Sequence, residues 1–252
     1  MKRIVPVIIV FVMQVFFTAC NSRSLQSQYS VLEKQTVFVE NSTVVKAARC
    51  AQLGVEGTPD CKILLESLPD IYSRSTGSGT FINRNGKITV LTVEHVCSGS
   101  DVPNLIERDE FMVEVKQEIK LKIASGNFVS FGKVIKADKE KDLCLIELDE
   151  QPNNARVAHV ALFPARKGSK VYYAGAPYGM MSNEFMMYFE GNYSGPHEGS
   201  DIFSLPCAPG ASGSSIRNEH GMIVSIVQKV HSKFNHVCFG ASTQSIRDFL
   251  SN

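Results

Sequence analysis

Three stretches of the chain hold side chains that could act together in nucleophilic catalysis. They are VLTVEHVCSG with His95, KEKDLCLIELD with Asp142 and APGASGSSI with Ser212, in that order along the sequence. A serine hydroxyl is a weak nucleophile at neutral pH and needs a base within hydrogen-bond distance. Histidine can accept that proton and return it to a leaving amine, while a carboxylate orients the imidazole and stabilises its charged form. The residue types and their order therefore predict a His–Asp–Ser triad.

Two glycines on either side of the serine strengthen this interpretation. Gly210 and Gly213 permit a tight turn around Ser212, because glycine adopts backbone conformations that other residues avoid. Such a turn can aim the backbone N–H groups of Gly210 and Ser212 at a developing oxyanion, a contribution of about 3 kcal/mol per donor. Each motif alone is weak, since Gly-x-Ser-Gly is common in turns. The three motifs together predict a nucleophile beside an oxyanion hole.

The elements that must position these residues are mostly strands. Short β-branched runs alternate with turn residues from about Thr76 onward, and 44% of the residues are hydrophobic, enough for one large core or two small ones. We expect an all-β protein of two packed six-stranded antiparallel β-barrels, the first over residues 76–150 and the second, after a connector, within 151–252. The final stretch TQSIRDFLSN has Ile246, Phe249 and Leu250 at helical spacing, which predicts a C-terminal helix.

The N-terminus predicts export. A basic MKR is followed by a long apolar run, and Thr18 and Ala19 before Cys20 resemble the lipobox of bacterial lipoproteins. We expect a signal peptide over residues 1–19 and a lipid anchor on Cys20 that holds the protein at the membrane of a bacterial cell envelope. A plain secretory signal cut near Ala19, giving a periplasmic or secreted protein, and an uncleaved membrane anchor are the alternatives.

Between this leader and the barrels, residues 20–29 are small and polar and predict a tether. Residues 30–75 predict an N-terminal extension, in which VLEKQTVFVE is a strand and STVVKAARCAQL a short helix. Cys50 and Cys61 close a loop and could form a local disulfide. Lipidation of Cys20 would leave six cysteines, and an oxidising compartment permits disulfides, but six cysteines allow many pairings. Buried free thiols remain an alternative for Cys97 and Cys144.

Charge and histidine spacing exclude two classes of partner. The formal net charge is +1, and no stripe of lysine and arginine predicts nucleic-acid binding. His231 and His236 are five residues apart in HSKFNH, whereas structural zinc sites favour tighter patterns that include cysteine. We therefore expect no metal and no other cofactor.

The sequence resembles the trypsin/chymotrypsin-like serine peptidases, in the bacterial branch that includes the glutamyl endopeptidases and the high-temperature-requirement proteases. GSGTFI…KITVLTVEHV is similar to the family's block around its histidine, and DLCLIEL is similar to the segment with its aspartate. PGASGSSIRNEHGMIVSI resembles the segment with its serine, and VYYAGAPYG resembles the opening of the second barrel. The resemblance runs from about Gly77 to Phe249 and implies a chymotrypsin-like pair of barrels.

The resemblance also implies the role of each site residue. His95 would be the general base, Asp142 its orienting acid and Ser212 the nucleophile, with Gly210 and Ser212 forming the oxyanion hole. The substrate pocket would be lined by the following residues: Pro206, Cys207, Gln228, Val230 and Gly240.

A Cys207–Cys238 disulfide beside that pocket is frequent in the family. The residue six positions before Ser212, at the base of the pocket, is not acidic. Val227 occupies the position at which the glutamyl endopeptidases use a histidine to bind acidic side chains. These differences imply a preference for a small-to-medium apolar residue.

The leading hypothesis is an exported, membrane-tethered serine endopeptidase that cleaves polypeptide substrates through an acyl-enzyme intermediate. The alternative is a catalytically silent pair of barrels that serves as a binding or assembly module. Such proteins often lose a triad residue, and here all three positions are filled.

Overall fold

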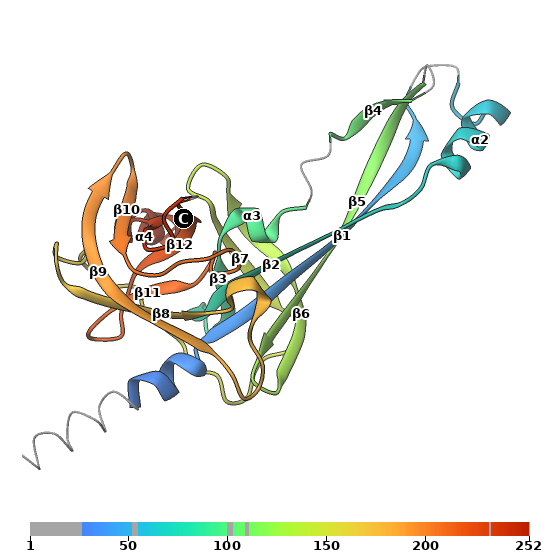
Figure 1. Ribbon diagram of the computed structural model, residues 1–252. Coiled ribbons are helices and arrows are strands. Elements are labelled where there is room, and N and C mark those ends of the chain that lie inside the picture. The colour runs from blue at the N-terminus through green and yellow to red at the C-terminus, as the bar shows by residue number, and fades with distance from the viewer. Residues whose placement is uncertain (1–26, 52–54, 100–102, 109–110, 232, 252) are drawn as a thin grey trace, which may run out of the picture.

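The computed structural model describes residues 27–51, 55–99, 103–108, 111–231 and 233–251. Two expected segments lie outside the described residues: the signal peptide over residues 1–19 and the part of the tether over residues 20–26, which includes Cys20. Among the helices that are described, none has the length and apolar character needed to cross a membrane. The described chain forms two antiparallel β-barrels and a long arm that projects from the first of them (Figure 1).

The first barrel is a ring of six strands with a seventh strand attached. The strands are β1 (Thr36–Cys50), β2 (Ile71–Arg84), β3 (Lys87–Thr92), β4 (Leu105–Arg108), β5 (Phe111–Ser125), β6 (Phe128–Asp138) and β7 (Leu143–Leu148). Their order is β1-β2-β3-β7-β6-β5-β4, and an additional pairing of β1 with β5 closes the ring. Alternate side chains such as Val37, Leu91 and Leu145 are fully buried and form the core of the barrel.

The second barrel is closed by six strands. They are β8 (Lys170–Gly175), β9 (Met187–His197), β10 (Ser200–Ser204), β11 (Ser215–Asn218), β12 (Ile223–Val230) and β13 (Cys238–Ala241). Their order around the barrel is β10-β13-β12-β11-β8-β9. A short 3-10 helix, η1 (Pro177–Gly179), follows β8, and the chain ends in helix α4 (Thr243–Ser251). The prediction of an all-β protein with two barrels and a C-terminal helix is confirmed.

The two barrels are joined by a connector and by a shared core. The backbone N–H of Ala158 in the connector donates to Phe81 of the first barrel, and that of Ala161 donates to Ile223 of the second, both at 2.8 Å. Helix α4 places Ile246 and Phe249 in a buried cluster that contains residues of both barrels. These contacts hold the two barrels against each other.

The expected helix over residues 42–53 is wrong, because these residues continue strand β1 to Cys50. Burial along β1 alternates with a period of two, and Asn41, Thr43 and Val45 all point inward. Strand β1 pairs with β2 on one edge and with β5 on the other over most of its length. Backbone pairing on both edges therefore outweighs the local helix propensity of VVKAAR. Since β1 is part of the ring, residues 30–75 are not a separate extension.

The start of the described chain also differs from the expectation. Residues 27–33 are helical, so the last residues of the expected tether are structured and the predicted strand begins only at Thr36. This helix lies against the second barrel, where the Tyr29 hydroxyl donates to Glu190 at 2.6 Å and the Tyr188 hydroxyl donates to Glu33 at 2.5 Å.

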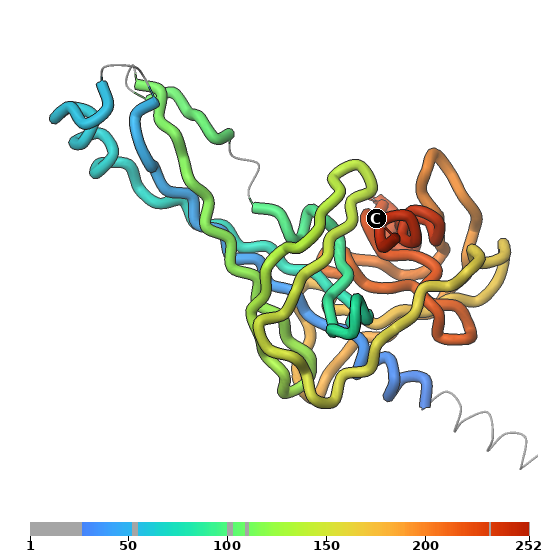
Figure 2. The backbone as a smooth tube through the Cα atoms, turned by 180° about the vertical axis from the view of Figure 1, so that it is seen from behind, coloured from blue at the N-terminus to red at the C-terminus, as the bar shows by residue number. Residues whose placement is uncertain are grey.

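The arm is the outer part of the long strands β1, β2 and β5, with β4 beside β5 (Figures 1 and 2). Helix α2 (Pro59–Ser67) lies at its tip, with the Thr58 hydroxyl accepting a hydrogen bond from the backbone N–H of Cys61. Cys50 at the end of β1 forms a disulfide with Cys61 in α2, as the loop between them suggests. The disulfide thus crosslinks β1 to α2 at the tip of the arm.

Candidate active site

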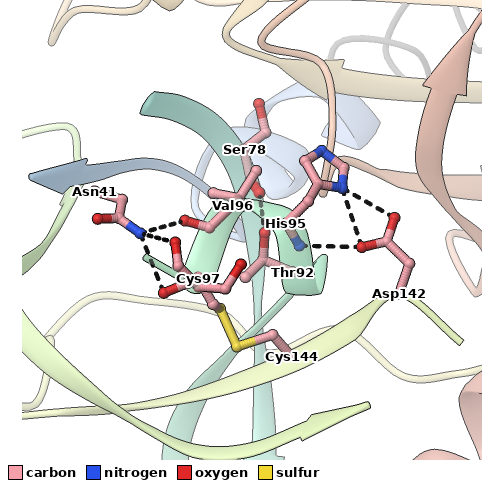
Figure 3. Close-up of a disulfide and its surroundings, with 9 residues drawn as sticks. Asn41, Ser78, Thr92, His95, Val96, Cys97, Asp142 and Cys144 are labelled. Carbon is pink, nitrogen blue, oxygen red and sulfur yellow. Dashed lines mark hydrogen bonds and ion pairs between the residues drawn. A yellow bond between two sulfur atoms is a disulfide. The ribbon is translucent and has the colours of Figure 1, made fainter. Parts of the chain in front are cut away.

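His95 lies at the rim of the first barrel. It belongs to α3 (Glu94–Cys97), a helix of 4 residues that follows the buried end of β3. Its side chain is 46% exposed, so a substrate can reach it. Its Nδ1 is 3.0 Å from both carboxylate oxygens of Asp142, and its backbone N–H donates to Asp142 Oδ1 at 3.1 Å (Figure 3). The carboxylate therefore holds both the ring and the backbone of the histidine.

The charge of Asp142 determines which ring nitrogen of His95 carries the proton. Burial of the carboxyl group would raise its pKa, but the hydrogen bonds from the His95 ring and backbone outweigh this effect and lower the pKa below its ordinary value. Asp142 is ionised at neutral pH and can only accept hydrogen bonds, so Nδ1 must be the donor. In the neutral imidazole Nε2 is then the unprotonated nitrogen, which is the form that a general base requires.

Asp142 itself has an unusual backbone. It precedes β7 and has a φ of 47°, in the left-handed region that non-glycine residues seldom adopt. The turn before it is held by Asp138, which accepts from the Lys141 backbone N–H at 2.9 Å. From the second barrel, Gln228 Nε2 donates to the carbonyl oxygen of Lys141 at 2.5 Å and to that of Asp142 at 3.4 Å. Contacts from both barrels thus hold the Asp142 backbone in a conformation that costs free energy, and this backbone positions the carboxylate.

Helix α3 is anchored from two further directions (Figure 3). Cys97 at its end forms a disulfide with Cys144 on β7, two residues after Asp142. Asn41, a buried residue of β1, donates from Nδ2 to the carbonyl oxygens of Val96, Cys97 and Ser98 at 3.0, 3.1 and 2.6 Å. These carbonyl groups at the end of a helix have no intrahelical donor, and Asn41 supplies one. The helix that carries His95 is therefore tied to the strand that follows Asp142.

Ser212 lies in the predicted turn between β10 and β11. Gly210 and Gly213 have φ values of 90° and 88°, so both require the conformation that only glycine adopts readily. A Cβ at Gly213 would fall on the carbonyl oxygen of Ser78 and the hydroxyl of Thr92, and one at Gly210 would lie 2.6 Å from the carbonyl oxygen of Ala176. Glycine is therefore needed at position 213 for the chain to pass close to the first barrel, and at position 210 for it to pass close to the segment after β8.

Two backbone N–H groups of this turn are free to bind an anion. Those of Gly210 and Ser212 donate no hydrogen bond within the described part of the chain. The carbonyl oxygen of Pro209, before the turn, accepts from the Tyr178 N–H at 2.7 Å, and that of Gly210 accepts from the Ser78 hydroxyl at 2.9 Å. With these two carbonyl groups engaged elsewhere, the free N–H groups fit the predicted oxyanion hole.

Ser78 on β2 is the main contact of the turn, and sequence reasoning missed it. Its backbone N–H donates to the carbonyl oxygen of Ser212 at 2.7 Å, and its carbonyl oxygen accepts from the Thr92 hydroxyl at 2.7 Å. Its own hydroxyl bridges the two barrels, accepting from the Ala176 N–H at 2.9 Å and donating to Gly210. The signal for this role was the Gly-Ser-Gly within a strand, since glycine in a strand often marks a close backbone approach. Asn41 carried no such signal.

The segments that carry the nucleophile and the base both approach Gly77 closely. A Cβ on that glycine would be 2.6 Å from Val96 Cγ2, next to His95, and 3.0 Å from the carbonyl oxygen of Ser212. The Ser212 hydroxyl donates to the carbonyl oxygen of Gln228 at 3.5 Å, and none of the hydrogen bonds of the described residues joins it to His95. Catalytic hydrogen bonds are often long or absent in ligand-free structures and form with the substrate.

The residues expected to line the substrate pocket divide into two groups. Cys207 forms a disulfide with Cys238 at the start of β13, as the resemblance implies, and β13 carries Gly240 beside β12. The carbonyl oxygen of Pro206 accepts from the Tyr173 hydroxyl at 2.9 Å, which holds this wall in place. The Gln228 side chain points to the turn before β7. This side chain positions Asp142, and only the Gln228 backbone lies beside Ser212.

The described residues contain no group of three or more His, Cys, Asp or Glu side chains arranged to hold a metal ion. His231 and His236 lie on an exposed loop before β13. No further role is assigned to them.

Comparisons with known proteins agree with this arrangement. Residues 77–226, which include all three predicted triad residues, match the family model described as a trypsin-like peptidase domain. A comparison with curated proteins found no match. Among solved structures, the active form of the Rv3671c protease from M. tuberculosis is similar with a TM-score of 0.60 and 15% identity, covering 89% of this chain and 82% of that chain. An inactive form of the Rv3671c protease has a TM-score of 0.56 and 14% identity, covering 89% and 91%. Likeness at these identities shows the fold.

Proposed function

The chain belongs to the family of trypsin-like peptidase domains, and on this premise we propose that it is a serine endopeptidase with His95, Asp142 and Ser212 as its triad. The observation that carries the proposal is the pairing of His95 Nδ1 with both oxygens of Asp142 at 3.0 Å. This pairing leaves Nε2 as a base on the side chain that faces solvent. The two free N–H groups of the turn at Ser212 supply the second requirement of acyl transfer.

The first half of the reaction forms an acyl-enzyme. The Ser212 hydroxyl turns from Gln228 to His95, a rotation about one side-chain bond, and loses its proton to Nε2 as its oxygen attacks the carbonyl carbon of the substrate. The carbonyl oxygen becomes an oxyanion that accepts hydrogen bonds from Gly210 and Ser212. The C–N bond then breaks, and His95 returns the proton to the leaving amine, which leaves the substrate's acyl group esterified to Ser212.

The second half repeats these steps with water. His95 takes a proton from a water molecule, whose oxygen attacks the ester carbon and forms a second oxyanion in the same hole. The ester bond breaks and the proton passes from His95 to the Ser212 oxygen, which restores the enzyme. Asp142 keeps its charge throughout and stabilises the imidazolium each time it forms.

The substrate pocket that we propose lies between the Cys207 loop and the backbone of Gln228 to Val230, with Gly240 at its back. It holds no acid at position 206 and no histidine at position 227, so a small-to-medium apolar side chain is the expected occupant. The Cys207–Cys238 disulfide ties the Cys207 loop to β13, which pairs with the strand of Gln228 and carries Gly240.

We propose in addition that the protein is exported and held at the membrane by a lipid on Cys20. Its support comes from the basic and apolar N-terminal sequence and from three disulfides, which persist in oxidising compartments. Mass spectrometry of the mature N-terminus tests it. A diacylated Cys20 supports the anchor, and an unmodified residue after Ala19 refutes it in favour of plain secretion.

The catalytic proposal is tested with a fluorophosphonate probe, which labels only activated serines. We expect labelling of the wild-type protein at Ser212 and complete loss of labelling and peptide cleavage in Ser212→Ala. A matched control is Ser214→Ala, because the Ser214 hydroxyl is buried two residues away and has no hydrogen-bond partner among the described residues. That variant should keep both activities. Failure of the folded wild-type protein to react would instead favour a catalytically silent binding module.

A further inference from the structure

The arm presents an unpaired strand edge that runs into the candidate active site. In the arm the strands are ordered β4-β5-β1-β2, so β2 is an outer strand. On its other side, β2 pairs with β3 only from Thr80 onward. Among the described strands, β1 pairs with this part of β2 on one edge, and no strand pairs with it on the other edge before Thr80. Figures 1 and 2 both show this part of β2 leading from the arm tip back to the barrels.

The backbone groups that face this open edge can be assigned by alternation. Phe81 donates its N–H to Gln35 on the β1 side, whereas Ser78 donates to Ser212 on the opposite side. The pairing of β2 with β1 continues from Thr80 to Ile71 without a shift of register. Even-numbered residues therefore face away from β1, because successive residues of a strand alternate in direction. Thr76, Arg74 and Tyr72 present their N–H and C=O groups at the open edge.

The outer part of this edge, residues 71–75, is exposed in the described structure. Exposed edge strands are usually blunted by proline, by a bulge or by a charged side chain, because they otherwise recruit another strand. Residues 71–76 contain no proline, and the strand has no bulge there. The one charge, Arg74, is drawn over β1 by an ion pair with Glu40 at 2.6 Å. The Tyr72 side chain is 74% exposed.

The position of the edge indicates what it binds. Ser78, two residues beyond Thr76, already holds the carbonyl group of Ser212 at 2.7 Å. A polypeptide with a bond at Ser212 must leave the site as an extended chain, and on this side the next backbone groups it meets are those of Thr76, Arg74 and Tyr72. We propose that one flank of the substrate adds to β2 as an extra strand along the arm. This inference rests on the proposed peptidase function and extends its binding site beyond the catalytic rim.

The proposal predicts a preference for extended, unfolded polypeptides over short peptides. Main-chain pairing along a sheet edge gives affinity with little dependence on sequence. From Tyr72 to Thr76 the edge is about 14 Å long at about 3.4 Å per residue, so it accommodates about five residues. Three outward-facing residues can form several main-chain hydrogen bonds, which should strengthen binding about tenfold.

A series of fluorescent peptides tests this length dependence. Each peptide has a core of six alternating alanine and valine residues. One peptide carries the extension Thr-Ser-Thr-Ser-Thr at its N-terminus, a second carries it at its C-terminus, and a third has no extension. The dissociation constants are measured by anisotropy on the full chain with Ser212→Ala, and kcat/KM is measured on the chain with Ser212. We expect extension at one end to tighten binding and raise kcat/KM about tenfold, and extension at the other end to have a smaller effect.

Variants of the edge decide whether β2 is responsible. Arg74→Pro removes an outward-facing N–H and leaves the pairing with β1 intact, while Arg74→Ala removes the same ion pair and keeps the N–H. The benefit of the extension should disappear in Arg74→Pro and persist in Arg74→Ala, with the core peptide unaffected in both. Tyr72→Pro, farther from the rim, gives an independent test if Arg74→Pro does not fold.

The outcomes separate this inference from the catalytic proposal. Length-dependent binding that Arg74→Pro abolishes supports the edge even if no peptide is cleaved, in which case the catalytic proposal alone fails. Cleavage without any effect of length, or an equal effect of length in the proline and alanine variants, overturns the edge and leaves the catalytic proposal standing. Absence of binding by every peptide also overturns it.

Discussion

Removal of the Cys97–Cys144 disulfide should weaken both the fold and the catalytic rate. This bond joins the helix of His95 to the strand that follows Asp142, across a sequence separation of 47 residues. In the chain-entropy model a crosslink of that span stabilises by about 4 kcal/mol. The Cys50–Cys61 bond spans only 11 residues at the arm tip, and the same model assigns it about 3 kcal/mol. The two disulfides thus differ by only about 1 kcal/mol in the stabilisation that they give. They differ in position, because one lies beside His95 and the other at the arm tip.

The comparison uses the double variants Cys97→Ala/Cys144→Ala and Cys50→Ala/Cys61→Ala. Urea unfolding at pH 7 measures the free energy of unfolding, and the slope should rise in both variants because the unfolded chain becomes more expanded. The first variant should also lose between about tenfold and about a hundredfold in kcat, since a shift of about 1 Å in a catalytic group has effects of that size. In the second, kcat should not change.

Two results would contradict this reasoning. One is an unchanged kcat after loss of the Cys97–Cys144 bond, which would mean that Asn41 and Asp142 alone suffice to hold α3. The other is a larger loss of stability from the bond at the arm tip than from the bond beside His95. The rate of fluorophosphonate labelling, measured on the same samples, shows whether any fall in kcat arises at the attack by Ser212.

Two other positions give further predictions. Asn41→Ala should lower the free energy of unfolding by about 2–4 kcal/mol, because two buried carbonyl groups and one partly buried carbonyl group lose their donor, and should lower kcat with KM unchanged; urea unfolding and steady-state kinetics measure both. Asp142→Asn should lose activity. Its free energy of unfolding should be lower than that of the wild-type protein at neutral pH, and this difference should depend on pH. The His95 hydrogen bonds lower the folded-state pKa of Asp142 despite its burial, so their stabilisation is present above about pH 4 and is lost as the pH falls through the folded-state pKa. Urea unfolding at pH 7 and pH 3 should show the difference between the two proteins shrinking at the lower pH.

The chemistry of this protein is visible in its sequence because it depends on local signals. Ser212 stands between two glycines that its turn requires, and the observed φ values of those glycines follow from that pattern. The strands around His95 and Asp142 show alternation or short apolar runs, which indicate their structure without reference to the rest of the chain. The C-terminal helix is likewise indicated by the helical spacing of its own apolar residues. Short-range spacing determined these features, and the structure agrees with it.

What the tertiary structure alone decided involves contacts between distant residues. The stretch VVKAAR has a local preference for helix, and only the pairing of β1 with β2 and β5 makes it a strand. The pairing of Cys97 with Cys144 was one of many possibilities until the strands brought them together. The reach of the Gln228 side chain across the barrels to the turn at Asp142 likewise depends on how the two barrels pack.

Asn41 shows most clearly why sequence was insufficient. It lies 54 residues before His95, in a strand with no motif, and its role exists only because the ring closes β1 beneath α3. The open edge of β2 has the same origin, since a strand becomes an edge only through the absence of a neighbour. Local patterns determine which residues can do chemistry, whereas the pairing of distant strands decides which of them meet, because that pairing depends on the free energy of the whole sheet.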